Sequence, residues 1–152
     1  MNRTQTGIFE PIPQHARYLF FDTIPGSDVL PALERLVSVS EGNELIVGLG
    51  QSLMSMLGVT IPGLRSFPVL VGPGIEVPST PAALWCWLRG QDRGDLLHRE
   101  RQLEQLLSDA FALKQVVDAF KYREGLDLTG YEDGTENPEG AEIGRASCRE
   151  RV

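Results

Sequence analysis

The sequence has few cysteines and an excess of acidic over basic residues. Its two cysteines, Cys86 and Cys148, are too few for a disulfide framework and lack the spacing of a zinc site. The 14 basic residues face 21 acidic ones. This balance argues against a nucleic-acid partner, because phosphate backbones are bound by clustered Lys and Arg. We interpret the excess negative charge as a solubility feature.

The sequence also lacks long hydrophobic runs. No apolar stretch approaches the roughly 20 residues that a membrane-spanning helix needs. The first 20 residues have neither a cationic start nor a continuous apolar stretch, so they do not resemble a secretory signal. We therefore expect no membrane partner and a cytoplasmic location. The 152 residues, 41% of them hydrophobic, fit one globular domain in which Cys86 is a small buried residue.

The last eleven residues differ in character from the rest of the chain. Residues 142–152, EIGRASCRERV, have no apolar periodicity and contain three Arg against two Glu. The string resembles the translated read-through of a commonly used sequencing adapter. We interpret 142–152 as a non-native tail and 1–141 as the domain, which then stops in a loop. A natural basic tail is the alternative interpretation.

The first half of the chain predicts a strand, a helix and a second strand. An aromatic and aliphatic run at 16–24 stops at Pro-Gly-Ser-Asp, which is typical of a strand that ends in a turn. A helix follows over 29–39, with Ser27 or Asp28 as its cap. Its apolar residues at helical spacing are Leu30, Leu33, Leu36 and Val37. Residues 44–49 then predict a short strand.

The middle of the chain is irregular after a brief helix predicted at 51–57. Residues 62–81 contain five prolines and three glycines, which remove ladder hydrogen bonds and interrupt helices. We therefore expect one long loop there. A loop of this length in a compact domain is usually functional or a docking surface.

The next segments predict a strand, a helix and a last strand. The strand at 82–88 has Trp85 and Trp87 on one face, and alternate aromatic residues favour a place in the core over a role as surface relays. A helix is expected between residues 92 and 110, and a strand at 113–122. The helix has an apolar stripe of Leu96, Leu103, Leu106 and Leu107, opposed by Arg99, Glu100, Arg101 and Glu104 on the solvated side.

The order of these elements predicts an α+β domain with the βαββαβ pattern of the ferredoxin-like fold. Both helices would cover one face of the sheet and leave the other face bare. A second copy of the same unit, in the same chain or in a partner, is the expected cover.

Two motifs that would indicate other functions are incomplete. Residues 48–53, GLGQSL, begin like a dinucleotide-binding fingerprint, but Leu53 occupies the third glycine position, so a strand end is expected. The acidic stretch at 126–141, LDLTGYEDGTENPEGA, lacks the ligand offsets of a calcium-binding EF-hand loop. Its composition alone favours a solvated acidic loop.

Within this acidic stretch, residues 130–138, GYEDGTENP, resemble the GxxDG signature of the dye-decolourising (DyP-type) haem peroxidases in its bacterial form. The stretches VPSTPAALWCWLRG at 77–90 and VVDAFKYREGLDLTG at 116–130 resemble the same family at the same distance from the motif. The resemblance covers 7–141. It implies the N-terminal half of a peroxidase, one ferredoxin-like half of a dimeric α/β barrel whose two halves face each other around haem b.

The resemblance also implies roles for residues of the motif. Asp133 would be the distal acid that moves a proton between the two oxygens of hydrogen peroxide. Glu132, Gly134 and Thr135 would lie beside the edge of the haem. Gly130 and Gly134 would allow a tight turn where a Cβ would clash with the macrocycle.

The resemblance implies that the axial histidine and the distal arginine of the family lie in the missing C-terminal half. We expect both histidines of this chain, His15 and His98, at the surface, and we assign neither Arg89 nor Arg123 as the distal arginine. The expected partners are hydrogen peroxide and small aromatic reductants such as dyes and phenols, in a parent protein that forms a homo-oligomer. The truncated chain is expected to bind haem poorly and to turn over little peroxide.

Two other functions remain open. The first is a non-catalytic ferredoxin-like module that pairs through its bare sheet face. The second is a haem-binding protein that serves iron release or transport.

Overall fold

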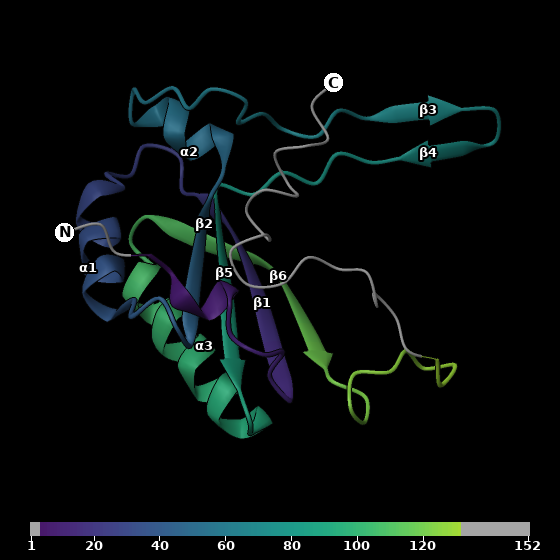
Figure 1. The fold of residues 1–152 in the computed structure, drawn as a ribbon. Helices are drawn as coiled ribbons and strands as arrows, with labels where there is room; N and C mark the ends of the chain where they lie inside the picture. The colour runs from purple at the N-terminus through teal and green to yellow at the C-terminus, as the bar shows by residue number, and fades with distance from the viewer. Residues whose placement is uncertain (1–3, 132–152) are drawn as a thin grey trace.

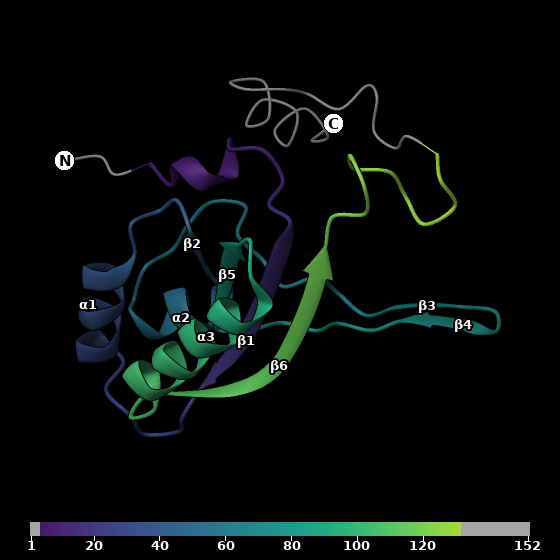
Figure 2. The same cartoon turned by 90° about the horizontal axis from the view of Figure 1, so that it is seen from below.

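A computed structural model describes residues 4–131 of the chain. Its main feature is an antiparallel sheet of four strands in the order β2-β5-β1-β6. These strands are β1 (His15–Thr23), β2 (Leu45–Leu49), β5 (Leu84–Gly90) and β6 (Phe111–Phe120). The helices α1 (Leu30–Val39) and α3 (Arg93–Leu107) cover one face of the sheet (Figure 1, Figure 2). The predicted α+β ferredoxin-like fold is confirmed.

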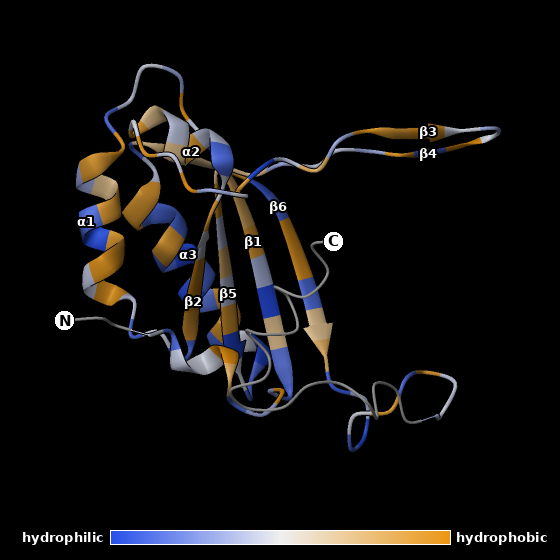
Figure 3. Ribbon diagram, turned by 45° about the horizontal axis from the view of Figure 1, so that its top comes forward, coloured by the Kyte–Doolittle hydropathy of each residue, from blue (hydrophilic) through white to orange (hydrophobic). Residues whose placement is uncertain are grey.

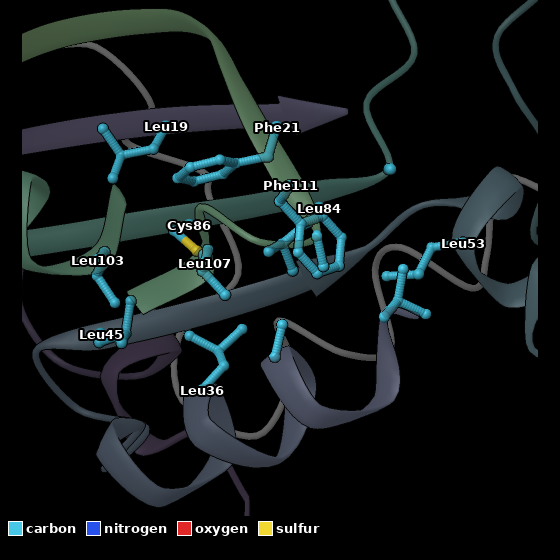
Figure 4. Close-up of a cluster of buried hydrophobic side chains, with 14 of the residues drawn as sticks. Leu19, Phe21, Leu36, Leu45, Leu53, Leu84, Cys86, Leu103, Leu107 and Phe111 are labelled. Carbon is cyan, nitrogen blue, oxygen red and sulfur yellow. The ribbon is translucent and has the colours of Figure 1, made fainter. Parts of the chain in front are cut away.

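The core lies between the sheet and these helices. In β1, Leu19 and Phe21 point to the helical side and are fully buried. The sheet register places Leu19 beside Cys86 of β5, and leucines of both helices close the cluster (Figure 4). Burial raises the pKa of the Cys86 thiol to about 12. Cys86 is therefore protonated and unreactive at neutral pH, as its predicted burial implies.

Short polar contacts set the ends of the helices. The Asp92 carboxylate accepts hydrogen bonds from the N–H groups of Gly94 at 2.7 Å and Asp95 at 3.0 Å, so Asp92 caps α3. At the start of α1, the Asp28 carboxylate accepts from the Leu30 N–H at 3.1 Å. The Ser27 hydroxyl donates to a carbonyl of the preceding turn. Of the two predicted caps, only Asp28 therefore contacts the helix.

Two short elements flank the central strands. The 3-10 turn η1 (Thr6–Ile8) precedes β1, and the helix α2 (Gln51–Met56) follows β2. Strand β2 and helix α2 confirm the predicted strand at 44–49 and the predicted brief helix at 51–57. The expected strand end near residue 49 is confirmed as well.

The predicted irregular loop at 62–81 contains a hairpin, so that prediction is wrong in part. Its strands are β3 (Leu70–Gly72) and β4 (Ile75–Val77), and both are rich in apolar residues (Figure 3). Pro73 lies in the turn, where no ladder hydrogen bond is needed, and Gly74 takes a positive φ of 75°. Proline and glycine usually interrupt a strand, but in this hairpin they form the turn that connects two strands. We call residues 67–79 the arm.

The polar side of α3 is less solvated than predicted. Glu100 is buried and pairs with the Nε of Arg17, which reaches it from β1. Arg99 is half-buried and lies 3.0 Å from a carboxylate oxygen of Glu44. Glu100 lies four residues after Leu96 and three before Leu103, so helical spacing places it on the leucine stripe, and its prediction as a solvated residue is wrong. Its charge is tolerated there because Arg17 of β1 pairs with it.

The apolar residues of α1 divide between core and solvent. Leu36 is buried and Leu33 is partly buried, whereas Leu30 and Val37 are exposed. Ala32, which the apolar spacing did not include, is fully buried. The buried stripe of α1 is therefore narrower than the one predicted from its sequence.

The last strand begins two residues earlier than predicted and contains a bulge. Its pairing with β1 shifts between Phe20 and Phe21, so that Lys114 is an extra residue between Leu113 and Gln115. As a result, Leu113 and Val116 both pack against the core. Strict alternation along a strand would place these two side chains on opposite faces.

Candidate functional site

The sheet face opposite the helices carries a cluster of three aromatic rings. The centroid of the Tyr18 ring lies 5.7 Å from that of Trp85 and 5.9 Å from that of Trp87, and the two indoles are 6.4 Å apart. These spacings lie within the range of favourable aromatic pairs. We call this surface the open face.

Trp85 and Trp87 are half-buried on the open face, so the prediction that they belong to the core is wrong. A strand alternates between two faces, and Leu84, Cys86 and Leu88 occupy the core side of β5. The tryptophans therefore point away from the helices. Sequence reasoning also missed Tyr18, although its alternation with buried Leu19 is the signal that could have found it.

Arg89 lies at one end of the open face and is buried. Its guanidinium donates hydrogen bonds to the carbonyl oxygens of Gly7 at 2.5 Å, Glu10 at 3.3 Å and Pro11. The same group lies over the Trp87 ring, 5.0 Å from its centroid. Arg89 therefore fixes the segment that precedes β1 across the end of the sheet.

The loop that leads to the acidic motif is organised by Asp127. Its carboxylate accepts hydrogen bonds from the hydroxyl and N–H of Thr129, the latter at 2.8 Å, and from the N–H of Tyr131 at 3.3 Å. The hydroxyl of Thr129 lowers the pKa of the Asp127 carboxyl, and backbone N–H groups add to this effect. Gly130 has a φ of 92°, which confirms that it needs glycine's backbone freedom.

The predicted motif residues Glu132, Asp133, Gly134 and Thr135 lie outside the described residues. Their positions relative to a haem therefore stay predictions. The described part of the motif ends at Tyr131, whose side chain is exposed. The turn at 127–131, which the Asp127 carboxylate holds together, therefore leads directly into the motif.

The two histidines lie on different elements of residues 4–131, and His98 lines a pocket of about 470 Å³ together with Asp95 and Arg99. His98 is exposed on α3, and His15 is half-buried at the start of β1, opposite Gly90 and Phe120. In this part of the chain, no three His, Cys, Asp or Glu side chains are grouped closely enough to hold a metal. A cavity of about 760 Å³ between α1 and β2 contains neither histidine in its lining. The described helices include none that is long and apolar enough to cross a membrane.

Comparison with known proteins gives one consistent family. No protein-family model matches the chain. Four curated proteins match it, and all four are named dye-decolorizing peroxidase. One of them, from Brevibacterium linens, is 34% identical over 99 residues, which are 64% of this chain and 27% of the relative. The predicted resemblance to the dye-decolourising peroxidases is confirmed by these matches.

Solved structures of dye-decolourising peroxidases share the fold. A proposed DyP-type peroxidase from Shewanella oneidensis has a TM-score of 0.74 and 26% identity, over 93% of this chain and 50% of the other. A DypB variant of Rhodococcus jostii RHA1 in complex with heme has a TM-score of 0.75 and 22% identity, over 90% and 49%. The chain therefore spans about half the length of these proteins and less than half that of the curated relatives.

Proposed function

We propose that this chain is the part of a haem-dependent peroxidase that supplies the distal acid, Asp133. The whole protein would reduce hydrogen peroxide and oxidise dyes, phenols or similar one-electron donors. The observation that carries the proposal is the match to four proteins named dye-decolorizing peroxidase. The GYEDGTENP motif, which follows directly from the Asp127 turn, adds support.

In this proposal the Asp133 carboxylate accepts a proton from one oxygen of hydrogen peroxide and returns it to the other, which leaves as water. Glu132, Gly134 and Thr135 would contact the edge of the haem. Haem b, when bound, supplies the oxidising chemistry. The axial histidine and the distal arginine would come from a second half of the polypeptide.

The open face is the surface on which we propose that this second half packs. Two ferredoxin-like units with facing sheets would then form a dimeric α/β barrel. The half-buried Tyr18, Trp85 and Trp87 support this arrangement, because full burial of a large apolar side chain contributes about 1.5–3 kcal/mol. A cytoplasmic location and a homo-oligomeric parent are further parts of the proposal.

The test compares two proteins. One is the chain itself, and the other is a longer polypeptide, encoded by the same source gene, that has the full length of the relatives. The extended protein is expected to bind haem and to oxidise a dye with hydrogen peroxide. Asp133→Asn should lower kcat/KM for hydrogen peroxide by roughly 10²–10⁴ while haem absorbance is retained. Glu124→Gln, which changes an exposed carboxylate outside the motif in the same way, is the matched control and should retain most of the activity.

Other outcomes would contradict the proposal in distinguishable ways. An extended protein without haem absorbance would favour the non-catalytic pairing module. A protein that binds haem and releases its iron without oxidising donors would favour iron release or transport. The chain alone should show no stoichiometric Soret band when haem is added. A strong band would refute the proposal that the haem ligands come from a second half of the polypeptide.

A further inference from the structure

We propose that the side chain of Gln5 closes one edge of the sheet and prevents any further strand from pairing with β2. Strand β2 is the outermost strand on its side of the sheet (Figure 1). The segment that carries Gln5 precedes β1, and we call residues 4–11 the strap. The proposal concerns the edge of the sheet and does not depend on the peroxidase function.

The free edge of β2 presents the backbone groups of every second residue. Glu44, just before the strand, accepts a hydrogen bond from the Arg89 N–H at 2.9 Å, so its backbone faces β5. Successive residues of a strand alternate, and the other even-numbered residues of β2 therefore face β5 as well. The N–H and C=O groups that point outward belong to Leu45, Val47 and Leu49.

Gln5 occupies both outward groups of Val47, the middle residue of the three. The Nε2 of Gln5 donates to the Val47 carbonyl oxygen at 2.9 Å, and the Val47 N–H donates to the Oε1 of Gln5 at 2.6 Å. A side-chain amide can do this because it carries a donor and an acceptor, as a peptide group does. Leu45 and Leu49 are four positions apart, so an incoming strand could not form two successive ladder pairs while Gln5 is in place.

Strand β2 lacks the charged residues, prolines and bulges that protect many edge strands. Its sequence, LIVGL, contains neither a charged residue nor a proline. Its pairing with β5 runs without a shift from Leu45 opposite Leu88 to Leu49 opposite Leu84. Short apolar segments of this kind pair readily with other strands when their edge is free. The contact with Gln5 therefore supplies protection that the sequence of β2 does not.

The strap is held in position on both sides of Gly7. The Gly7 N–H donates to the Gly42 carbonyl at 2.8 Å, and the Gly7 carbonyl accepts from the Arg89 guanidinium at 2.5 Å. A Cβ on Gly7 would lie 2.1 Å from the carbonyl oxygen of Asn43, so only glycine allows this close approach. These contacts place Gln5, two residues earlier, beside the middle of β2.

The closure acts in the same way on any incoming strand. A strand from the rest of the polypeptide and a strand from another copy would need the same N–H and C=O groups of Val47. Either would have to displace Gln5 first. In a solution of the chain alone, the strand that can take its place is β2 of a second copy.

Hydrogen exchange of single backbone amides tests whether Gln5 holds the edge. In the unchanged chain the Val47 N–H should exchange slowly, although it points away from the sheet. Gln5→Ala removes its acceptor and should speed the exchange of this amide by roughly tenfold. The amides of Ile46 and Gly48, which face β5, should keep their rates and so report an intact sheet. NMR of the labelled chain measures all three.

Sedimentation velocity tests whether the opened edge then pairs with another strand. Gln5→Ala should associate roughly tenfold more strongly than the unchanged chain. Gln14→Ala is the matched control, because the Gln14 amide also donates to a backbone carbonyl, that of Lys121 at 3.1 Å. Lys121 lies beyond the end of β6, so this variant should change neither the exchange of Val47 nor the association.

A second substitution shows which surface the association uses. Leu49→Lys, at a position of β2 that is 41% exposed, should return the Gln5→Ala chain to the association of the unchanged chain. A lysine on an edge strand opposes pairing of two copies. A general charge effect has the opposite sign, because an added lysine makes the net charge of −7 less negative and reduces repulsion.

Three results would overturn the proposal. The first is equal exchange of the Val47 amide in the Gln5→Ala chain and the unchanged chain. The second is a Gln5→Ala chain that associates no more strongly than the unchanged chain or the Gln14→Ala control. The third is stronger association that persists when Leu49→Lys is added, because the contact would then lie away from β2.

Discussion

Arg89 shows how one side chain joins segments that are far apart in the sequence. It reaches Gly7, 82 positions earlier, and Pro11, 78 positions earlier. Neither segment has a pattern that predicts this contact, because a guanidinium bound to backbone carbonyls requires no particular residue type in its partner. Cys86 is the opposite case, since an apolar run on a strand was enough to predict its burial.

Replacement of Arg89 should therefore destabilise the domain. Arg89→Met leaves the carbonyls of Gly7, Glu10 and Pro11 without their donor and should lower the free energy of unfolding by about 2–3 kcal/mol. Urea denaturation measures this change. Arg101→Met, at an exposed position of α3, is the control and should stay within about 0.5 kcal/mol. Equal effects of the two substitutions would show that the Arg89 contacts contribute little.

Asp127 gives a prediction of pH dependence at the entry to the motif. Its pKa is lowered in the folded turn, so the turn is favoured while the carboxylate is ionised. That contribution is present above the ordinary aspartate pKa of about 3.9 and is lost as the pH falls through the lowered value. Thr129→Val should raise the pKa of Asp127, whereas Thr129→Ser should keep it low. NMR titration of the Asp127 carboxyl carbon measures its pKa in both variants. Equal pKa values in the two variants would contradict the claim that the Thr129 hydroxyl lowers the pKa of Asp127.

At the scale of elements, α3 is joined to β1 by an ionic contact as well as by leucines. Arg17 pairs with Glu100 of α3 and, at 2.8 Å, with Asp118 of β6. The leucine spacing predicted the helix and its buried side. That spacing also includes Glu100, but the charged partner that makes its burial possible is supplied by a strand 83 positions away.

Loss of the Glu100 carboxylate should weaken the packing of α3. Glu100→Ala leaves Arg17 partly buried with Asp118 as its remaining partner, and should lower the free energy of unfolding by about 2–3 kcal/mol. Glu104→Ala, one turn later on the exposed side of α3, should change it by less than about 0.5 kcal/mol. Thermal or urea unfolding of the two variants checks the difference. Similar values would mean that the Arg17–Glu100 contact is not a net stabiliser.

At the scale of the whole molecule, the two faces of the sheet have different roles. The helical face holds the core, while the open face presents Tyr18, Trp85 and Trp87 and is the proposed site of a second ferredoxin-like unit. The arm is a separate surface beyond β6 (Figure 2).

The type and order of the main elements could be predicted from the sequence, because hydrophobic periodicity and turn residues act locally. The sequence also carried the family resemblance through the GYEDGTENP motif, whose residues Asp133 and Thr135 lie beyond the described part. The structure was needed to show which face of β5 meets the helices, that Pro73 and Gly74 join two strands, and that Arg17 pairs with Glu100. Each of these depends on which distant segment packs against the residue, and a local pattern contains no information about that partner.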